Sequence, residues 1–402
     1  MTTTITNARI FDGENVIDDR IVVIDGEHIH SVGGVMPTGS SVIDAHCGTL
    51  MPGLIDSHVH TDLDGLRDAL QFGVTTELEM NGHWSHKARK KIAGRNDIAD
   101  LRSSGMGITP KGGHPTQYMK SSSNLLIRFL YHYPVVSTPE EAAKFVAKQV
   151  AKGADYIKIF IESGSCVGFP GLPVLNDEIL ISAVIAAHSF HKMAIAHITE
   201  MEEANRAIKA GVDGLAHIFF DRQATNEIVS AIVSSGAFVI PTLVTISSAV
   251  GNNASAFAAD ERVKSRLNQK WLDSLSRSMN VYPTGNLDDV FANIMVLHKS
   301  GVDILAGSDV SEPILNLGGL AHGASLHQEL QMLVAAGLTP VESLRAATSI
   351  PSRRFGLTDR GRIAVGARAD LLLVDGDPTT NIGDTLSIRA VWRRGSRLVI
   401  NG

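Results

Sequence analysis

The chain has 402 residues, more than the size at which one hydrophobic core usually stops growing, so we expect one large domain and a smaller one. Its 44% hydrophobic and 19% charged residues are typical of a globular α/β protein and not of a disordered, fibrous or membrane-embedded chain. The net charge of −6 includes no basic blocks, which argues against nucleic acid or an anionic membrane as the main partner and favours a small-molecule substrate.

The number of cysteines and the first residues of the chain indicate the cellular compartment in which the protein is expected. Cys47 and Cys166 are too few for a disulfide framework and lie far apart in sequence, which indicates a reducing compartment. The first residues include no basic segment followed by an apolar run, and no stretch reaches the roughly 18 apolar residues that a membrane-spanning helix needs. We expect a cytoplasmic protein that forms a homo-oligomer.

Both ends of the chain show a sequence pattern of short strands separated by turn residues. In the first fifty residues, Asp12-Gly13 and Asp25-Gly26 interrupt short apolar runs, and the last forty show the same pattern around Asp375-Gly376 and Arg394-Gly395. We therefore expect residues 1–50 and 360–402 to form one composite β-sandwich domain.

Between the two ends, apolar strand-like runs alternate with helical patterns, which indicates repeated βα units and a parallel sheet. Eight such runs are found: residues 53–58, 74–80, 105–109, 155–160, 193–198, 214–218, 237–243 and 302–307. Helical patterns at 138–153 and 200–210 separate some of them. The pattern predicts a (β/α)₈ TIM-type barrel over residues 51–359, with an open doubly wound sheet as the alternative.

The strongest local signal is the run Pro52-Gly53-Leu54-Ile55-Asp56-Ser57-His58-Val59-His60. Residues two apart on a strand point to the same face, so both imidazoles can converge on one ion at the carboxyl end of the strand, where barrel active sites lie. A lone His-x-His is weak evidence, because two ordinary polar residues at a strand end would look the same.

Three further polar residues stand near the ends of predicted strands. His197 and His217 each follow an apolar run, and Asp309 ends the run that begins at Gly301. Imidazole is the commonest metal ligand, and a carboxylate can bind a metal and still accept a proton from water. Each residue alone has a plain structural interpretation, a hydrogen-bonded histidine or a helix N-cap aspartate, but their shared position favours a metal site.

Lys158 lies within the apolar run Asp155-Tyr156-Ile157-Lys158-Ile159-Phe160, where a free ammonium would be costly to bury. Burial lowers the pKa of a lysine, so its amine can be neutral and nucleophilic. Such an amine can react with carbon dioxide to give a carbamate, whose two oxygens can bridge two cations. The alternative is a lysine that extends out of the barrel or pairs with Glu162.

Together these residues resemble the amidohydrolase superfamily, in particular its imidazolonepropionase-like and dipeptidase-like branch of metal-dependent hydrolases. The matching positions are His58-x-His60 after Pro52-Gly53-Leu54-Ile55-Asp56, then Lys158, His197, His217 and Gly307-Ser308-Asp309. Agreement continues in Leu326-His327-Gln328-Glu329-Leu330, Ala346-Ala347-Thr348, Gly361-Arg362-Ile363 and Gly366-Ala367-Arg368-Ala369-Asp370-Leu371. The resemblance spans nearly the whole chain.

The resemblance implies a pair of divalent metal ions, expected to be Zn²⁺, at a binuclear centre. The implied ligands are His58, His60, carboxylated Lys158, His197, His217 and Asp309. In such a centre Lys158 bridges both ions through its carbamate, and Asp309 also acts as general base and then acid. Two cations lower the pKa of a water, and one polarises the scissile carbonyl.

This reasoning predicts a metal-dependent enzyme that hydrolyses an amide or peptide-like C–N bond by metal-activated hydroxide. The expected substrate is an N-acyl amino acid, a dipeptide or an aryl amide. Alternatives within the superfamily are an ester, lactone or carbamate hydrolase, or a deaminase or cyclic-imide hydrolase. Lys158 argues against the mononuclear deaminases, which usually lack it. A catalytically silent scaffold is less expected, because such proteins commonly lose ligands.

Substrate contacts are harder to assign. Lys111-Gly112-Gly113-His114-Pro115 resembles segments that contribute to the active site in relatives, so His114 is expected to bind substrate and stabilise the intermediate. Tyr118, His322 and Thr242 are further candidate pocket residues. Many relatives carry an Arg-Asp pair at the end of the second strand, whereas this chain reads Glu77-Leu78-Glu79, so their substrate specificity does not carry over directly.

Overall fold

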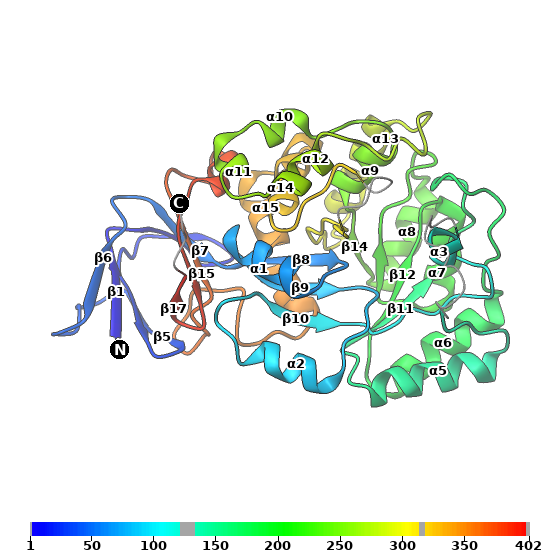
Figure 1. The fold of residues 1–402 in the computed structure, drawn as a ribbon, viewed down its shortest axis with the longest axis horizontal. Helices are drawn as coiled ribbons and strands as arrows, with labels where there is room; N and C mark the ends of the chain where they lie inside the picture. The colour runs from blue at the N-terminus through cyan, green and yellow to red at the C-terminus, as the bar shows by residue number, and fades with distance from the viewer. Residues whose placement is uncertain (1, 121–132, 313–317, 399–402) are drawn as a thin grey trace.

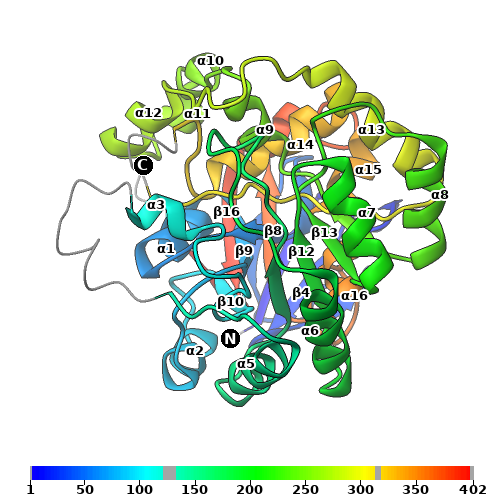
Figure 2. The ribbon, with the colours of Figure 1, turned by 90° about the vertical axis from the view of Figure 1, so that its right-hand side faces the viewer.

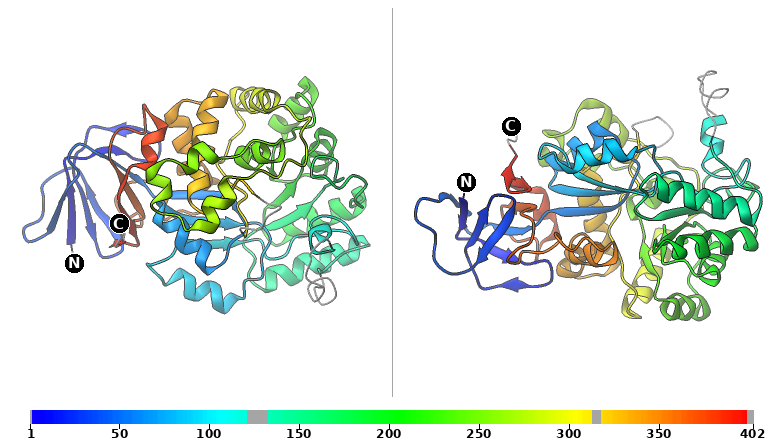
Figure 3. Two further views of the ribbon diagram at one scale, coloured as in Figure 1. Left: turned by 45° about the horizontal axis from the view of Figure 1, so that its top comes forward. Right: turned by 90° about the horizontal axis from the view of Figure 1, so that it is seen from below.

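The computed structural model describes residues 2–120, 133–312 and 318–398. Figure 1 shows strands from both ends of the chain side by side at the left and a larger body of parallel strands and helices at the right. In both views of Figure 3, these terminal strands again lie to one side of the larger body. Within the described ranges, no helix has the length and apolar character needed to cross a membrane.

The smaller part consists of two sheets with a common core. The first has the order β5-β4-β1-β6, with β1 (Thr2–Thr6), β4 (Val22–Asp25), β5 (His28–Val32) and β6 (Ser41–Asp44). The second has the order β17-β16-β15-β7-β2-β3, with β2 (Arg9–Phe11), β3 (Val16–Ile17), β7 (Thr49–Pro52), β15 (Leu371–Val374), β16 (Ile388–Arg393) and β17 (Ser396–Arg397). Strands from the two ends of the chain therefore share one sheet, and β7 continues past residue 50 to Pro52.

Strand β15 shows how the smaller part meets the larger one. Successive side chains of a strand point to opposite faces. Leu371 and Leu373 lie in the core between the two sheets, whereas Leu372 and Val374 lie in the main hydrophobic core. All four side chains are buried, so this run is apolar at every position instead of alternating.

Among its described residues, the larger part contains seven parallel strands and an eighth extended segment. The strands are β8 (Leu54–Val59), β9 (Val74–Glu79), β10 (Asp100–Ser103), β11 (Ile157–Phe160), β12 (Ala194–His197), β13 (Gly214–Ala216) and β14 (Phe238–Ile240). They form one group of order β10-β9-β8 and another of order β11-β12-β13-β14. The third strand differs from the prediction: it is Asp100–Ser103, and residues 105–109 contribute a bridge at Ile108.

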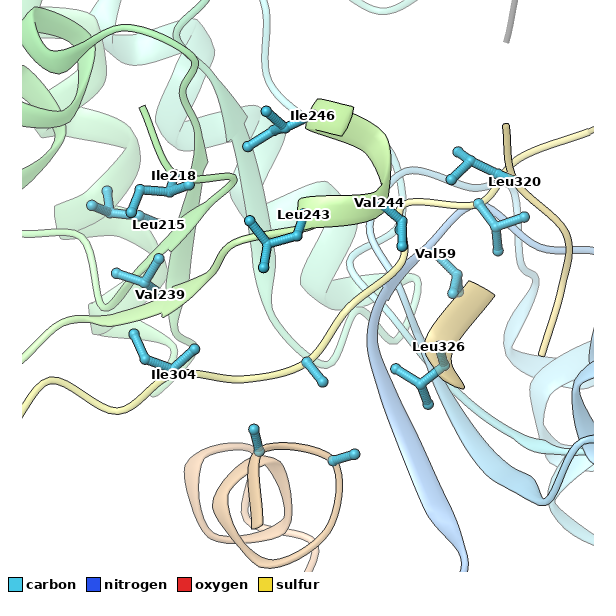
Figure 4. Packing of buried hydrophobic residues seen from close by; sticks show 14 of the residues in the cluster. Val59, Leu215, Ile218, Val239, Leu243, Val244, Ile246, Ile304, Leu320 and Leu326 are labelled. Atoms are coloured by element: carbon cyan, nitrogen blue, oxygen red, sulfur yellow. The ribbon is translucent and has the colours of Figure 1, made fainter. Parts of the chain in front are cut away.

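Parallel bridges close these groups into a ring. Ile108 pairs with Ile159 of β11, Val239 of β14 pairs with Ile304, and Val310 pairs with Val59 of β8. In Figure 4, the side chains of Leu215, Val239 and Ile304, from neighbouring members of this ring, lie next to one another. The predicted (β/α)₈ barrel is thereby confirmed, with residues 302–310 as its eighth strand.

Helices surround the strands in the end view of Figure 2. The helices are α1 (Leu63–Gln71), α2 (His86–Ala93), α3 (Thr116–Lys120), α5 (Pro139–Ala151), α6 (Asp177–Ser189), α7 (Met201–Ala210), α8 (Asn226–Ser235), α9 (Leu243–Ala249), α10 (Ser255–Ala258), α11 (Glu261–Lys264), α12 (Gln269–Leu275), α13 (Leu287–Lys299), α14 (Ala324–Ala336), α15 (Pro340–Ala346), α16 (Ser349–Arg354) and η1 (Ile382–Leu386). Helix α5 illustrates their sequence logic: the Thr138 hydroxyl accepts from the Glu141 amide, Pro139 opens the helix, and Phe145 and Val146 are buried.

A buried network of arginines and carboxylates joins β10 to the C-terminal part of the chain. Asp100 pairs with Arg360 and with Arg393, whose Nη2 lies 3.5 Å from Asp100 Oδ1, and Arg393 also pairs with Asp370 at 3.2 Å. Each of these side chains is at most 2% exposed. Buried charges are costly unless they are paired, so the network requires both parts of the molecule to be in place.

Candidate metal centre

The candidate site forms at the carboxyl ends of the barrel strands. His58 lies in β8, His60 follows it, His217 follows β13, and Asp309 lies in the eighth strand. The Nε2 atoms of His58 and His60 are each 3.2 Å from Asp309 Oδ1, and Nε2 of His217 is 3.8 Å from Asp309 Oδ2. Ligand atoms of His58, His217 and Asp309 all lie within 4.8 Å of one another, a donor set suited to a divalent cation.

His197 and Lys158 belong to the same group of side chains. The ring centroid of His197 is 4.8 Å from that of His217. Lys158 is fully buried, and its Nζ has no hydrogen-bond partner among the described residues. Burial lowers the pKa of Lys158 to about 7, although nearby Asp309 and Glu79 favour the charged form. The alternative pairing of Lys158 with Glu162 is not seen among the described residues, since Lys158 Nζ has no hydrogen-bond partner there and Glu162 contacts His197.

The outer ring nitrogens of two histidines are engaged by neighbouring side chains. Nε2 of His197 lies 2.9 Å from Glu162 Oε2, and Nδ1 of His217 contacts the Thr242 hydroxyl. Such contacts leave one ring nitrogen of each imidazole for a cation and fix the ring orientation. Thr242, expected as a pocket residue, therefore lies behind His217.

Burial controls the charge of the imidazoles and of the carboxylate. It is the largest cause of the low pKa of His58, His114, His197 and His217, and nearby Lys158 lowers each further. Burial acts in the opposite sense on Asp309, but His217 and His60 bring the pKa of Asp309 below its ordinary value. Neutral imidazoles and an ionised carboxylate are the forms that bind metal.

Two expected substrate-binding residues lie against this group. The ring of His114 stacks on that of His197 with centroids 4.5 Å apart, and its Nδ1 is 2.8 Å from Gln117 Nε2. The Tyr118 ring meets the His114 ring edge-on at 5.6 Å. His114 therefore contacts the His197 ring directly, and Tyr118 lies on the other ring contact of His114.

His322 lies in different surroundings. Its Nδ1 is 3.2 Å from Glu77 Oε1, and its ring lies 5.4 Å from that of Trp271. Glu77 raises the pKa of His322 against the effect of burial. Neither the Glu77 hydrogen bond nor the Trp271 ring contact involves any of the six expected ligands.

Sequence reasoning did not predict several polar contacts around the ligands. Glu162 contacts His197, Gln117 contacts His114, and Asp56 accepts the His58 amide at 3.2 Å. Glu162 stands four positions after Lys158, so the period-two pattern of β11 carried a signal for it. Gln117 could not be assigned in this way because it lies beyond the strands.

Two cavities lie away from the ligands. One, of about 410 Å³, is lined by residues such as Tyr156 and Met193, which precede β11 and β12 and so mark the amino ends of the barrel strands. The other, of about 470 Å³, lies beside α2 and is lined by residues including Trp84 and Arg89. Barrel enzymes act at the carboxyl ends of the strands, so we place the candidate site at the histidines.

Among curated proteins, the chain is similar to adenine deaminase 2 of Latilactobacillus sakei, with 23% identity over 410 residues. The match covers 98% of this chain but 56% of that protein, so the chain spans about half the length of this relative. It is also 22% identical to the protein Rv2915c of Mycobacterium tuberculosis, over 84% of this chain and 81% of that one.

Solved structures share the fold over nearly the whole chain. A Xaa-Pro dipeptidase with bound methionine has a TM-score of 0.75 and 22% identity, with 99% of this chain and 100% of that chain covered. Phenylurea hydrolase B has a TM-score of 0.77 and 20% identity, with 100% and 97% covered. The amidohydrolase family model matches residues 49–398, and the chain therefore belongs to the amidohydrolase family.

Proposed function

We propose that this protein is a binuclear metal-dependent amidohydrolase that cleaves an amide or peptide-like C–N bond of a small molecule. The observation that carries the proposal is Lys158: a fully buried amine with no hydrogen-bond partner among the described residues, within the same group as four histidines and Asp309. An amine in such a position is costly unless it is modified or neutral. A carbamate on Lys158 would supply the bridging oxygens that a pair of cations requires.

The side chains present fit a pair of divalent cations. His58, His60 and Asp309 would hold one, His197 and His217 the other, with a carbamate on Lys158 shared between them. Imidazole and carboxylate ligands suit zinc, which we propose as the metal. When bound, the cations supply a polarised scissile carbonyl and a water of lowered pKa.

The chain's own residues then provide proton transfer and positioning. Asp309 has a lowered pKa, so it is ionised at neutral pH and can accept a proton from the attacking water. The carboxylic acid formed in this way can next donate that proton to the leaving nitrogen, which regenerates the carboxylate and leaves no net proton change on the enzyme. His114, stacked on His197, is placed to donate a hydrogen bond to the substrate oxygen as negative charge develops.

A deaminase is the second candidate, since the adenine deaminase relative matches 98% of this chain. Lys158 favours the binuclear hydrolase over it, because the bridging lysine is usually absent from mononuclear deaminases of the superfamily. Esters, lactones and carbamates present the same carbonyl to the same groups and remain alternatives for the scissile bond.

The test combines metal content with a substrate screen. Purified protein is stripped with a chelator, reloaded with Zn²⁺ in bicarbonate buffer, and assayed on N-acyl amino acids, dipeptides, aryl amides, matched esters and adenine. We expect about two metal ions per chain and amide hydrolysis that is lost on chelation. Ammonia release from adenine with no amide hydrolysis would favour the deaminase, and a protein that binds no metal would refute the proposal.

We also propose that the protein is a cytoplasmic homo-oligomer. Light scattering coupled to size-exclusion chromatography tests the assembly, because a chain of 43.0 kDa and its oligomers differ clearly in mass. Cell fractionation tests the compartment.

A further inference from the structure

Glu162 lies directly behind an expected cation ligand. It follows β11, and its Oε2 is 2.9 Å from Nε2 of His197, which ends β12. Glu162 is 1% exposed and His197 is 5% exposed, so water does not compete for this contact. The hydrogen bond therefore has a strong influence on which ring nitrogen of His197 carries its proton.

The Glu162 carboxylate is itself held in place from both sides. Its Oε1 accepts the Gly164 amide at 2.6 Å, and its Oε2 accepts the Thr199 hydroxyl at 2.9 Å in addition to His197. Glu203 fixes the surrounding backbone, since it accepts the amides of Ser163 at 2.6 Å and Thr199 at 2.7 Å. With donors at both oxygens, Glu162 is arranged to accept hydrogen bonds.

An accepting carboxylate selects one tautomer of the imidazole. If Oε2 accepts from Nε2–H, the proton of neutral His197 resides on Nε2 and the lone pair is left on Nδ1. Glu162 is not the counter-ion of Lys158, because the Lys158 Nζ makes no hydrogen bond within the described part of the chain. Glu162 thus reaches the candidate metal centre through its contact with His197.

We propose that Glu162 is a positioning residue that holds His197 in the Nε2–H tautomer, so that Nδ1 binds one of the divalent cations. This inference rests on the cation-binding role of His197 in the proposed function. Partners of this kind behind metal-binding histidines typically change metal affinity by about 10- to 100-fold. Glu162 thus sets the affinity of the cation that His197 and His217 share.

Glu162→Gln is the informative substitution. A glutamine side chain has one oxygen, and satisfying the Gly164 amide with it turns the amide nitrogen toward His197. An N–H group facing Nε2 favours the opposite tautomer, whose Nδ1 is protonated and cannot bind a metal. Glu162→Ala removes the acceptor altogether. Glu202→Gln, an exposed change on the first turn of α7, is the matched control for loss of a carboxylate.

The first readout is Zn²⁺ binding to metal-free protein by calorimetry and equilibrium dialysis. We expect Glu162→Gln and Glu162→Ala to weaken one of the bound Zn²⁺ ions by about 10- to 100-fold and leave the other unchanged, with Glu202→Gln like the wild type. Wild-type affinity in both Glu162 variants overturns the proposal while leaving the proposed function intact. Absence of Zn²⁺ binding by the wild type overturns both.

The second readout needs no metal. Nitrogen NMR of ¹⁵N-histidine-labelled, metal-free protein reports the protonation of each ring nitrogen, and the His197 signals are assigned by their loss in His197→Ala. We expect the Nε2–H tautomer in the wild type and a shift toward Nδ1–H in Glu162→Gln. An Nδ1–H tautomer in the wild type overturns the proposal. This readout also decides the case if Glu162→Ala fails to fold.

Discussion

Asp56 and Ser308 join the first and last strands of the barrel. Asp56 Oδ1 accepts the Ser308 amide at 3.0 Å, and Oδ2 accepts the Ser308 hydroxyl at 2.6 Å. The same Oδ1 accepts the amide of His58 at 3.2 Å. One carboxylate thus sets the spacing between the backbone of His58 and that of Asp309, which both carry expected cation ligands.

This relationship predicts unequal effects of two substitutions. Asp56→Ala leaves two buried amides and one hydroxyl without an acceptor, and each unsatisfied group costs about 1–3 kcal/mol. Ser308→Ala removes the hydroxyl's two hydrogen bonds, one donated to Asp56 and one accepted from the Val310 amide, each worth about 1 kcal/mol. Urea unfolding of the metal-free variants measures both losses, and we expect the loss for Asp56→Ala to be clearly larger. Equal losses would contradict the proposed role of Asp56.

Asp309→Asn separates proton transfer from metal binding. The amide oxygen can still act as a ligand, but the amide nitrogen cannot accept a proton, so we expect kcat to fall by about 10²–10⁴-fold with metal retained. Steady-state kinetics and elemental analysis on the same preparation test this. Asp303→Asn is the control, because Asp303 pairs with Arg353 away from the ligands. Unchanged turnover in Asp309→Asn would remove Asp309 from the mechanism.

The barrel was predictable because its strands are buried runs. Gly214–Ala216 and Phe238–Ile240 are apolar throughout. Between them, the buried residues of α8 recur at helical spacing in the sequence. The third strand was misplaced because the polar residues Asp100, Arg102 and Ser103 interrupt the apolar pattern. A local pattern assigns such charged residues to a loop. In the fold, Asp100 is buried in a strand because Arg360 and Arg393, which are distant in sequence, pair with its carboxylate.

The expected ligands could be named because strand ends of a barrel converge on one face. Many contacts around them could not be predicted, because pairs such as Asp56 with Ser308 or His217 with Thr242 lie far apart in sequence. The Glu77 partner of His322 is a further contact of this kind, since the two residues lie far apart in sequence, and the substrate-binding role of His322 stays a prediction.

Glu329 provides a pH-dependent test of a buried carboxyl. Its oxygens accept the amides of Leu243 and Val244, and burial raises its pKa from 4.5 to about 8. A raised acid pKa means that the folded state holds the proton longer, so stability falls as the pH rises from 4.5 to 8. Glu329→Gln leaves one amide without an acceptor and should cost about 1–3 kcal/mol at pH 5.

The difference in unfolding free energy between Glu329→Gln and the wild type should shrink toward pH 8. The wild type loses stability as Glu329 gives up its proton, whereas the glutamine has no proton to lose. Denaturant unfolding of metal-free protein at several pH values measures it. A difference that stays constant or grows across this range would show that Glu329 does not titrate as expected.

Asp100→Asn tests the buried arginine network. The substitution leaves Arg360 and Arg393 with less compensating charge, and breaking a buried pair typically costs about 3–5 kcal/mol. These arginines lower the pKa of Asp100 although burial opposes them. A lowered acid pKa stabilises the fold above 3.8 and loses that contribution as the pH falls. We therefore expect the difference in unfolding free energy between the wild type and Asp100→Asn to narrow in acid. A difference that does not change with pH would show that the arginines do not stabilise the ionised form of Asp100.

Lys158→Met tests the cost of burying an amine that makes no hydrogen bond within the described residues. Burial lowers the Lys158 pKa from 10.5 to about 7, so between these values the unfolded state binds more protons than the folded state. Stability of the metal-free wild type should rise with pH across this window, and Lys158→Met should remove that rise. At pH 6, where the ammonium is charged, the methionine variant should be the more stable protein, because it buries no charge.

Unfolding is measured in CO₂-depleted, chelator-treated buffer, since a carbamate or a bound cation would stabilise the wild type. If Lys158→Met is less stable at pH 6, the amine has a stabilising partner and the basis for its carboxylation is lost.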